Sequence, residues 1–165
     1  MNKNVLPNYE IHQDTVALIP AYHPDYDTIV IERYQRLCVK KTPLQLIKLA
    51  SIEGGADYDG RRKSVIHKTG AKHKVPIPVN PNEQIYAFPT HSASQHKCAW
   101  IFYYHVKTIK PSNKKLNHSI ITFNNGTTLP LDVSFTSLRR QMKRTSYCIV
   151  RFSKRSPFDD DSFIG

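Results

Sequence analysis

Residues 120–131 read Ile-Ile-Thr-Phe-Asn-Asn-Gly-Thr-Thr-Leu-Pro-Leu, and this stretch indicates most clearly how the chain folds. The pair Asn125-Gly126 is preferred in two-residue type I′ turns, because both central residues of such a turn need a positive φ. Apolar and β-branched residues flank the pair on both sides. The stretch therefore predicts a β-hairpin, and it favours a fold in which antiparallel strands predominate.

Further strand patterns lie on either side of this hairpin. Residues 99–107 are largely apolar and predict a buried strand. Four prolines within residues 74–92 exclude a helix there and favour extended segments or edge strands. Residues 9–19 and 28–34 predict two strands that pair antiparallel, and residues 147–152 predict a last strand.

Two short segments have helix patterns. Thr42 is a good N-cap, Pro43 suits the first helical position, and the glycines at 54–55 end that helix after about ten residues. Residues 134–145 predict a second helix, which is amphipathic and basic. Residues 56–63 predict a turn. The fold class expected from these patterns is α+β, a single domain of mostly antiparallel β-structure with two short helices.

The chain has 165 residues, a length typical of one domain. We predict one domain over residues 1–155 and a short acidic tail without fixed structure over residues 156–165. No secretion signal is apparent at the N-terminus, and the longest apolar stretch is shorter than the roughly 20 residues that a spanning helix needs. The three cysteines lack a closely spaced partner, which predicts reduced, buried thiols. We therefore expect a cytoplasmic protein.

Charge is distributed very unevenly along the chain. Residues 1–60 contain six Lys/Arg and eight Asp/Glu, whereas residues 61–155 contain eighteen Lys/Arg and only two Asp/Glu. The formal net charge of the whole chain is +11. A positive field of this size favours a polyanionic partner, and the absence of a membrane anchor favours nucleic acid over a membrane surface.

Several short stretches between residues 40 and 152 carry a resemblance to a known family. They are Lys41-x-Pro43-Leu44-Gln45, Gly54 through Tyr58-x-Gly60-Arg61, Lys74-x-Pro76-Ile77 through Phe88-Pro89-Thr90-x-Ser92, Cys98-x-Trp100-Ile101, His105-Val106 and Phe123-x-Asn125-Gly126. In this order and at this spacing, they resemble the ComK family of competence transcription factors.

The resemblance implies a transcriptional activator of competence (DNA-uptake) genes that binds AT-rich promoter boxes, largely through the minor groove. It implies double-stranded DNA and further copies of the chain as partners, the copies cooperating on DNA, and it implies no enzymatic activity. The first forty residues match the family poorly, and the chain ends sooner after its last predicted strand than family members do. A proteolysis adaptor that docks in that region is therefore a less expected partner.

Two basic segments form the predicted DNA-binding site. Residues 61–74 contain six Lys/Arg and no acid, and a second group flanks the apolar stripe of the helix predicted at 134–145. Arg61 and Arg62 follow a predicted turn, which can present arginines to a DNA groove, so we predict that they read the bases. The cations on the helix flank suit phosphate contacts. The predicted DNA-binding residues are Arg61, Arg62, Lys63, Lys72, Lys74, Arg139, Arg140, Lys143 and Arg144.

Other interpretations of these residues are structural or enzymatic. Both basic segments are also compatible with solvated surface. Asp57 and Asp59 resemble the metal-binding carboxylates of a nuclease, but neighbouring glycines favour a turn. Zinc-ligand types occur without the usual close spacing at His91, His96, Cys98 and His105. We predict no metal, no cofactor and no catalytic residue.

The alternation of Trp100, Phe102 and Tyr104 predicts core packing in preference to base stacking. The functional alternative to a transcription factor is a nucleic-acid-processing enzyme or an RNA-binding protein that uses the same basic surface.

Overall fold

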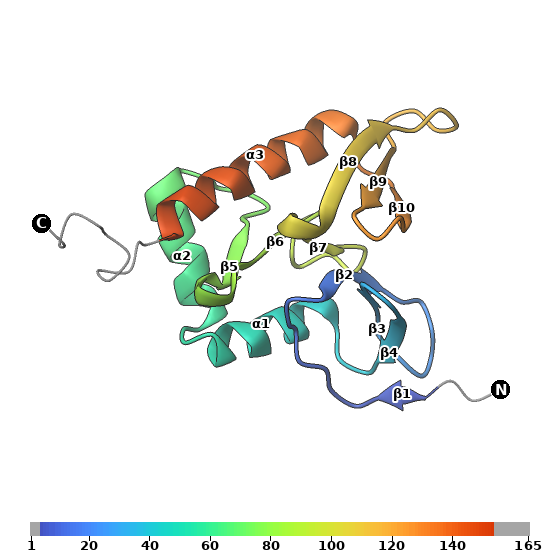
Figure 1. The fold of residues 1–165 in the computed structure, drawn as a ribbon, viewed down its shortest axis with the longest axis horizontal. Coiled ribbons are helices and arrows are strands. Elements are labelled where there is room, and N and C mark those ends of the chain that lie inside the picture. Colours follow the sequence, from blue (N-terminus) through green and yellow to red (C-terminus); the bar gives the residue numbers. More distant parts are fainter. Residues whose placement is uncertain (1–3, 154–165) are drawn as a thin grey trace, which may run out of the picture.

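The computed structural model describes residues 4–153 and shows three helices and two sheets within them (Figure 1). The larger sheet has the spatial order β1-β4-β3-β2-β7-β6-β5, and its neighbouring strands are antiparallel except for β1 and β4. Its strands are β1 (Val5–Leu6), β2 (Thr15–Pro20), β3 (Thr28–Glu32), β4 (Arg36–Val39), β5 (Ile77–Asn80), β6 (Ile85–Pro89) and β7 (Trp100–Phe102).

A smaller antiparallel sheet follows in the chain, with the order β10-β9-β8. It consists of β8 (Val106–Pro111), β9 (Ser119–Phe123) and β10 (Thr128–Leu131). The helices are α1 (Pro43–Glu53), α2 (Tyr58–Thr69) and α3 (Phe135–Phe152), and two 3₁₀ turns span Pro81–Glu83 and Tyr103–His105.

Both faces of the larger sheet are buried, because consecutive residues of its central strands enter different core clusters. Leu18 packs with Leu46 of α1 on one face, while the preceding Ala17 packs with Ile121 of β9 and Leu138 of α3 on the other. A strand that is covered on both faces has an apolar run without alternation. This arrangement places α1 on one side of the sheet, and α3 with the smaller sheet on the other.

The predicted fold class is confirmed: the structure is α+β with mostly antiparallel strands. The first predicted helix is confirmed at α1, where Thr42 and Gln45 form the capping box. The strands predicted at 9–19 and 28–34 pair antiparallel as β2 and β3, although β2 begins only at Thr15. All three cysteines are free and buried.

The predicted hairpin at 120–131 is also confirmed, but its turn is of a different type. Of the pair Asn125-Gly126, only Gly126 has a positive φ, of 88°. The amide of Gly126 donates to the carbonyl of Phe123 at 2.9 Å, which closes a turn over residues 123–126. A type I turn followed by a left-handed glycine is the usual three-residue hairpin loop. In this three-residue loop, one residue with a positive φ is enough to match the twist of the strands, whereas a type I′ turn needs two.

Three predictions about the elements were wrong. Residues 58–69 form α2, where a turn leading into a basic segment was expected, so the described residues contain three α-helices. Residues 147–152, expected as a strand, continue α3 as one helix of 18 residues. The strand expected over 99–107 ends at Phe102, and the chain passes through a 3₁₀ turn into β8 of the other sheet. The acidic tail at 156–165 lies outside the described residues.

Candidate nucleic-acid interface

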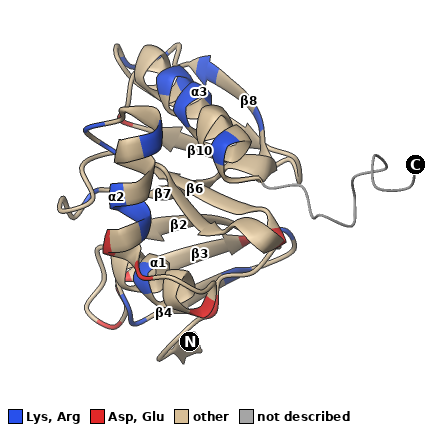
Figure 2. Ribbon diagram, turned by 90° about the vertical axis from the view of Figure 1, so that its left-hand side faces the viewer, with Lys and Arg blue, Asp and Glu red and all other residues tan. Residues whose placement is uncertain are grey.

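The two basic segments predicted from the sequence lie side by side, because α2 packs against α3 (Figure 2). Val65 of α2 and Cys148 of α3 share a small core cluster with Tyr86 of β6. At the edge of this contact, the Lys68 ammonium lies 4.3 Å from the centroid of the Phe152 ring. Figure 2 shows Lys and Arg along both helices and on β8. The basic segments of α2 and α3 therefore lie next to each other in the fold.

The start of α2 shows how the expected turn becomes a helix. Asp57 is the N-cap, and its carboxylate accepts a hydrogen bond from the amide of Gly60 at 2.8 Å. The helix buries Tyr58, Arg61 and Val65, which are spaced three and four residues apart. The carboxylate of Asp57 thus serves as the hydrogen-bond acceptor for an amide at the N-terminus of the helix, which is a structural role.

Arg61 differs from the other predicted DNA-binding residues because it is buried, with 8% of its surface exposed. Its guanidinium donates to the carbonyls of Ser51, Gly54 and Ala56, at 2.8 to 3.3 Å. Burial lowers the pKa of Arg61. The side chain fastens α2 to the end of α1. The prediction that Arg61 and Arg62 follow a turn was wrong, since both lie within α2.

The remaining cations of α2 face outward. Arg62 is half-buried and Lys63 is exposed. Gly70, with a φ of 74°, ends the helix in the left-handed conformation that glycine adopts without strain. The chain then turns into a loop that presents Lys72 to solvent.

This loop is fastened to α3 by a set of hydrogen bonds. The Lys74 ammonium donates to the Ser137 hydroxyl at 2.8 Å, and the Gln141 side-chain amide donates to the Lys74 carbonyl at 2.8 Å. The Arg144 guanidinium donates to the His73 carbonyl at 3.1 Å. Lys74 and Arg144 therefore position the loop, and Lys72 is held beside the cations of α3.

The outer side of α3 presents the predicted phosphate contacts. Leu138, Gln141, Thr145 and Cys148 are buried at helical spacing. This leaves Arg139, Arg140 and Lys143 exposed on the opposite side.

Among residues 4–153, the cations of this surface have no acidic partner close enough to neutralise them. Burial lowers the pKa of Lys74, and the nearby charges of Arg144 and Arg140 lower it further. Within residues 4–153, the ion pairs closer than 4.0 Å all involve other residues: His12–Glu32, His23–Asp25, Arg33–Asp14, His91–Asp132 and Lys97–Asp132. Adjacent like charges without acidic partners repel one another, and a bound polyanion would relieve that repulsion. We define the α2–α3 surface as Arg62, Lys63, Lys72, Arg139, Arg140, Lys143 and Arg144.

The sequence reasoning missed a third group of cations, on the hairpin formed by β8 and β9. This hairpin contacts α3 through β8, and it contains Lys107, Lys110, Lys114 and Lys115. Residues 106–131 contain no Asp or Glu, and this acid-free run is the sequence pattern that identifies the hairpin as basic.

The residues considered as zinc ligands do not converge. His91 lies 3.0 Å from Asp132, the Cys98 thiol donates to the His91 carbonyl, and His105 bonds the Gln13 carbonyl at 2.7 Å. In the described part of the chain, no three His, Cys, Asp or Glu side chains are grouped closely enough to hold a metal ion. Of the aromatic strand residues, Trp100 and Phe102 are buried as predicted, whereas Tyr104 is 47% exposed.

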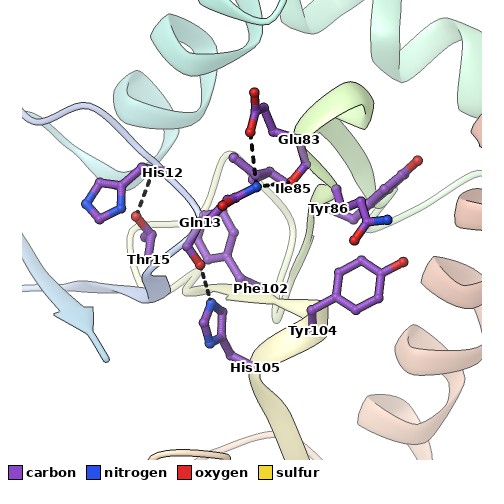
Figure 3. A pocket seen from close by; sticks show the side chains of 10 residues that line it. His12, Gln13, Thr15, Glu83, Ile85, Tyr86, Phe102, Tyr104 and His105 are labelled. Atoms are coloured by element: carbon purple, nitrogen blue, oxygen red, sulfur yellow. Dashed lines mark hydrogen bonds between the residues drawn. The ribbon is translucent and has the colours of Figure 1, made fainter. Parts of the chain in front are cut away.

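A pocket of about 270 Å³ is lined by residues that do not belong to the α2–α3 surface. Figure 3 shows how these residues lie. The Gln13 side-chain amide donates to the Glu83 carboxylate at 3.0 Å, and His105 bonds the backbone of Gln13. These contacts fasten the segment before β2 to two other parts of the chain, so its polar groups serve the fold. No helix within residues 4–153 combines the length and the apolar character needed to cross a membrane.

Comparison with known proteins agrees with the motifs in the sequence. The family model described as ComK protein matches residues 6–157. A protein of Bacillus subtilis (strain 168), named competence transcription factor, is 32% identical over 151 residues, which cover 91% of this chain and 78% of the relative. No solved structure matched. The predicted family is thereby confirmed: the chain belongs to the ComK family.

Proposed function

We propose that this protein is a transcription factor that activates competence genes by binding AT-rich duplex DNA with the α2–α3 surface. The observation that carries the proposal is the set of adjacent cations on two packed helices, which have no acidic partner within the described residues. Lys and Arg neutralise DNA phosphates and release their counterions. Membership of the ComK family and the name of the Bacillus subtilis relative support transcription as the context.

Within this surface we assign two kinds of contact. The cations of α3 lie in a row beside a buried stripe, and they suit phosphates. Arg62 and Lys63 lie at the start of α2, and we propose that Arg62 reads base edges or groove shape, because a narrow A-tract minor groove attracts arginine. Arg61, which is bonded to three carbonyls, has no part in this assignment.

Fluorescence anisotropy with AT-rich duplex DNA, GC-rich duplex DNA and duplex RNA tests the function. We expect the tightest binding to AT-rich DNA and competition by an AT-selective minor-groove ligand. Arg62→Ala should weaken the AT-rich complex by about 1–3 kcal/mol and reduce the preference over GC-rich DNA. Equal affinity for all three nucleic acids would contradict a sequence-preferring activator.

We further propose that copies of the chain bind DNA cooperatively and that the protein is not an enzyme. Binding to a duplex with two AT-rich boxes, one helical turn apart, should be steeper than binding to a duplex with one box. Identical binding curves would contradict cooperation between copies. Labelled DNA and RNA should stay intact during incubation with magnesium, and specific hydrolysis would favour a nucleic-acid-processing enzyme.

A further inference from the structure

The hairpin of β8 and β9 projects from the end of the molecule at which α3 begins (Figure 1). Its Lys107, Lys110, Lys114 and Lys115 are all exposed. A groove of about 790 Å³ lies against it, lined in part by Lys110, Lys114, Lys115 and His118. The one carboxylate of that groove belongs to Asp132, which already lies near His91 and Lys97. The hairpin is therefore strongly basic.

The loop at the tip of the hairpin is held in place by its own hydrogen bonds. The Ser112 hydroxyl accepts from the amides of Lys114 and Lys115, at 3.2 and 3.3 Å. The Ser112 amide donates to the His118 carbonyl at 2.9 Å, which extends the pairing of the strands beyond β8. A loop fastened in this way presents its outer side chains in a defined arrangement.

An apolar side chain, that of Leu116, lies in the loop at the tip of the hairpin. Leu116 is 89% exposed, the highest value among the large apolar residues described, and it follows Lys114 and Lys115 directly. A leucine this exposed contributes almost nothing to the core, so its apolar surface is available to a partner. An exposed apolar side chain next to basic groups is the feature with which several architectural proteins separate neighbouring base pairs from the minor groove.

We infer that the β8–β9 hairpin is a second DNA-contacting element, in which Leu116 inserts between base pairs in the minor groove while Lys114 and Lys115 contact the flanking phosphates. This inference rests on the proposed DNA binding, and it adds a second element of the protein that contacts DNA. Duplex DNA is favoured as the occupant because the hairpin has the same charge as α3 and contacts that helix. Half a turn of DNA is about 17 Å. The six residues of β8 rise about 3.3 Å each. The strand is therefore long enough to place the tip of the hairpin a similar distance from the helices.

The test compares five variants with the wild-type chain on one AT-rich duplex, and one of them, Arg139→Gln with Arg140→Gln, probes the α2–α3 surface. Leu116→Ala removes the wedge, and Tyr34→Ala is its control, because Tyr34 is 83% exposed but lies between β3 and β4. Lys114→Gln with Lys115→Gln removes two charges from the hairpin. Arg36→Gln with Lys40→Gln removes two exposed charges elsewhere. Anisotropy gives the affinity, and energy transfer between dyes at the two ends of the duplex gives the bend.

We expect the wild-type protein to bend the duplex by about 20–90°. Leu116→Ala should lose most of this bend and about tenfold in affinity, and the hairpin lysine variant should lose at least as much affinity. Both controls should behave as the wild type. Because Leu116 is exposed, its truncation leaves the fold intact, and circular dichroism verifies this.

Two outcomes overturn the hairpin assignment and leave the proposed function standing. In the first, both hairpin variants retain affinity and bend, while Arg139→Gln with Arg140→Gln weakens binding. In the second, the hairpin variants change sedimentation but not DNA binding, which would assign the hairpin to contacts between copies of the chain. A wild-type protein that binds no duplex DNA would instead overturn both the hairpin assignment and the proposed function.

Discussion

Charged side chains serve different purposes in the strands before α1 and on the α2–α3 surface. Among the strands, Glu32 is buried and accepts hydrogen bonds from Tyr9 and Gln35, and it pairs with His12 at 2.8 Å. On the α2–α3 surface, the exposed cations have no acidic partner within the described residues. The difference indicates that charge stabilises the fold in the first region and is left for a partner in the second.

The pKa of Glu32 supports this view of the first region. Burial by itself raises the pKa of this carboxyl, but the hydrogen bonds from Tyr9, Gln35 and His12 outweigh burial and lower the pKa below its ordinary value of 4.5. Burial and the bond to Glu32 also raise the pKa of Tyr9, which stays protonated as the donor. The ionised carboxylate is therefore the form that the folded state prefers.

Arg61 is an exception among the basic residues of α2, because its side chain stabilises the fold. Its removal should have the largest effect on the free energy of unfolding. Arg61→Ala leaves three carbonyls at the junction of α1 and α2 without their donor, and it should lower the free energy of unfolding by about 2–4 kcal/mol. Arg62→Ala should change the free energy by less than about 0.5 kcal/mol. Urea unfolding followed by circular dichroism measures both. A stable Arg61→Ala protein that no longer binds DNA would return Arg61 to the DNA interface.

Glu32→Gln should have the next largest effect, because it replaces charge-assisted hydrogen bonds with neutral ones. We expect a loss of about 1–3 kcal/mol in the free energy of unfolding at pH 7. Since the folded pKa of Glu32 is lowered, its contribution is complete above the ordinary value of 4.5 and disappears as the pH falls through the folded value. Unfolding curves of the wild type and the variant should therefore converge in acid. A difference that grows in acid would have the wrong sign.

Neutralising α3 should affect DNA binding but not the fold. Arg139→Gln with Arg140→Gln should weaken all duplexes by about 1 kcal/mol for each lost phosphate contact. The slope of log affinity against log salt should become shallower by about 0.9 for each such contact. Anisotropy at several salt concentrations gives both quantities. Loss of preference for AT-rich DNA, at unchanged overall affinity, would assign readout to α3 and positioning to α2.

The smallest effect is expected for the exposed pair of Asp14 and Arg33, whose charged groups lie 3.8 Å apart with about half of each side chain accessible. Such pairs contribute little, because water and salt screen them. Asp14→Asn with Arg33→Gln should change the free energy of unfolding by less than about 0.5 kcal/mol and leave the DNA affinity unchanged. A marked loss of DNA affinity would show that the interface extends to this end of the molecule.

Local sequence patterns predicted those parts of the fold that local interactions determine. The capping box at Thr42 and the glycine turn at Gly126 are two such cases. The sequence pattern did not reveal α2, because Arg61 occupies a core-facing position that a periodic pattern assigns to an apolar residue. The end of α3 was predicted as a strand because Ile149 and Val150 favour strands. There, packing against α2 outweighs that preference.

The basic half of the chain was visible in the sequence, but the arrangement of its residues was not. Charge counting identified the cations of α2 and α3, whereas only the packing of the helices shows that they adjoin. Charge counting also cannot separate the buried Arg61 from the half-buried Arg62, since that distinction depends on carbonyls at the end of α1. The hairpin lysines were missed because only the fold brings their strand, β8, against α3.

A salt titration of wild-type binding to an AT-rich duplex tests the central claim most directly, because the claim concerns cations that have no acidic partner among residues 4–153. Each phosphate contact contributes about 0.9 to the slope of log affinity against log salt. We expect several cations of the α2–α3 surface to contact phosphates at once. The predicted slope of log affinity against log salt is therefore about −4 to −6. Tight binding with a nearly flat slope, or no binding at low salt, would contradict the account.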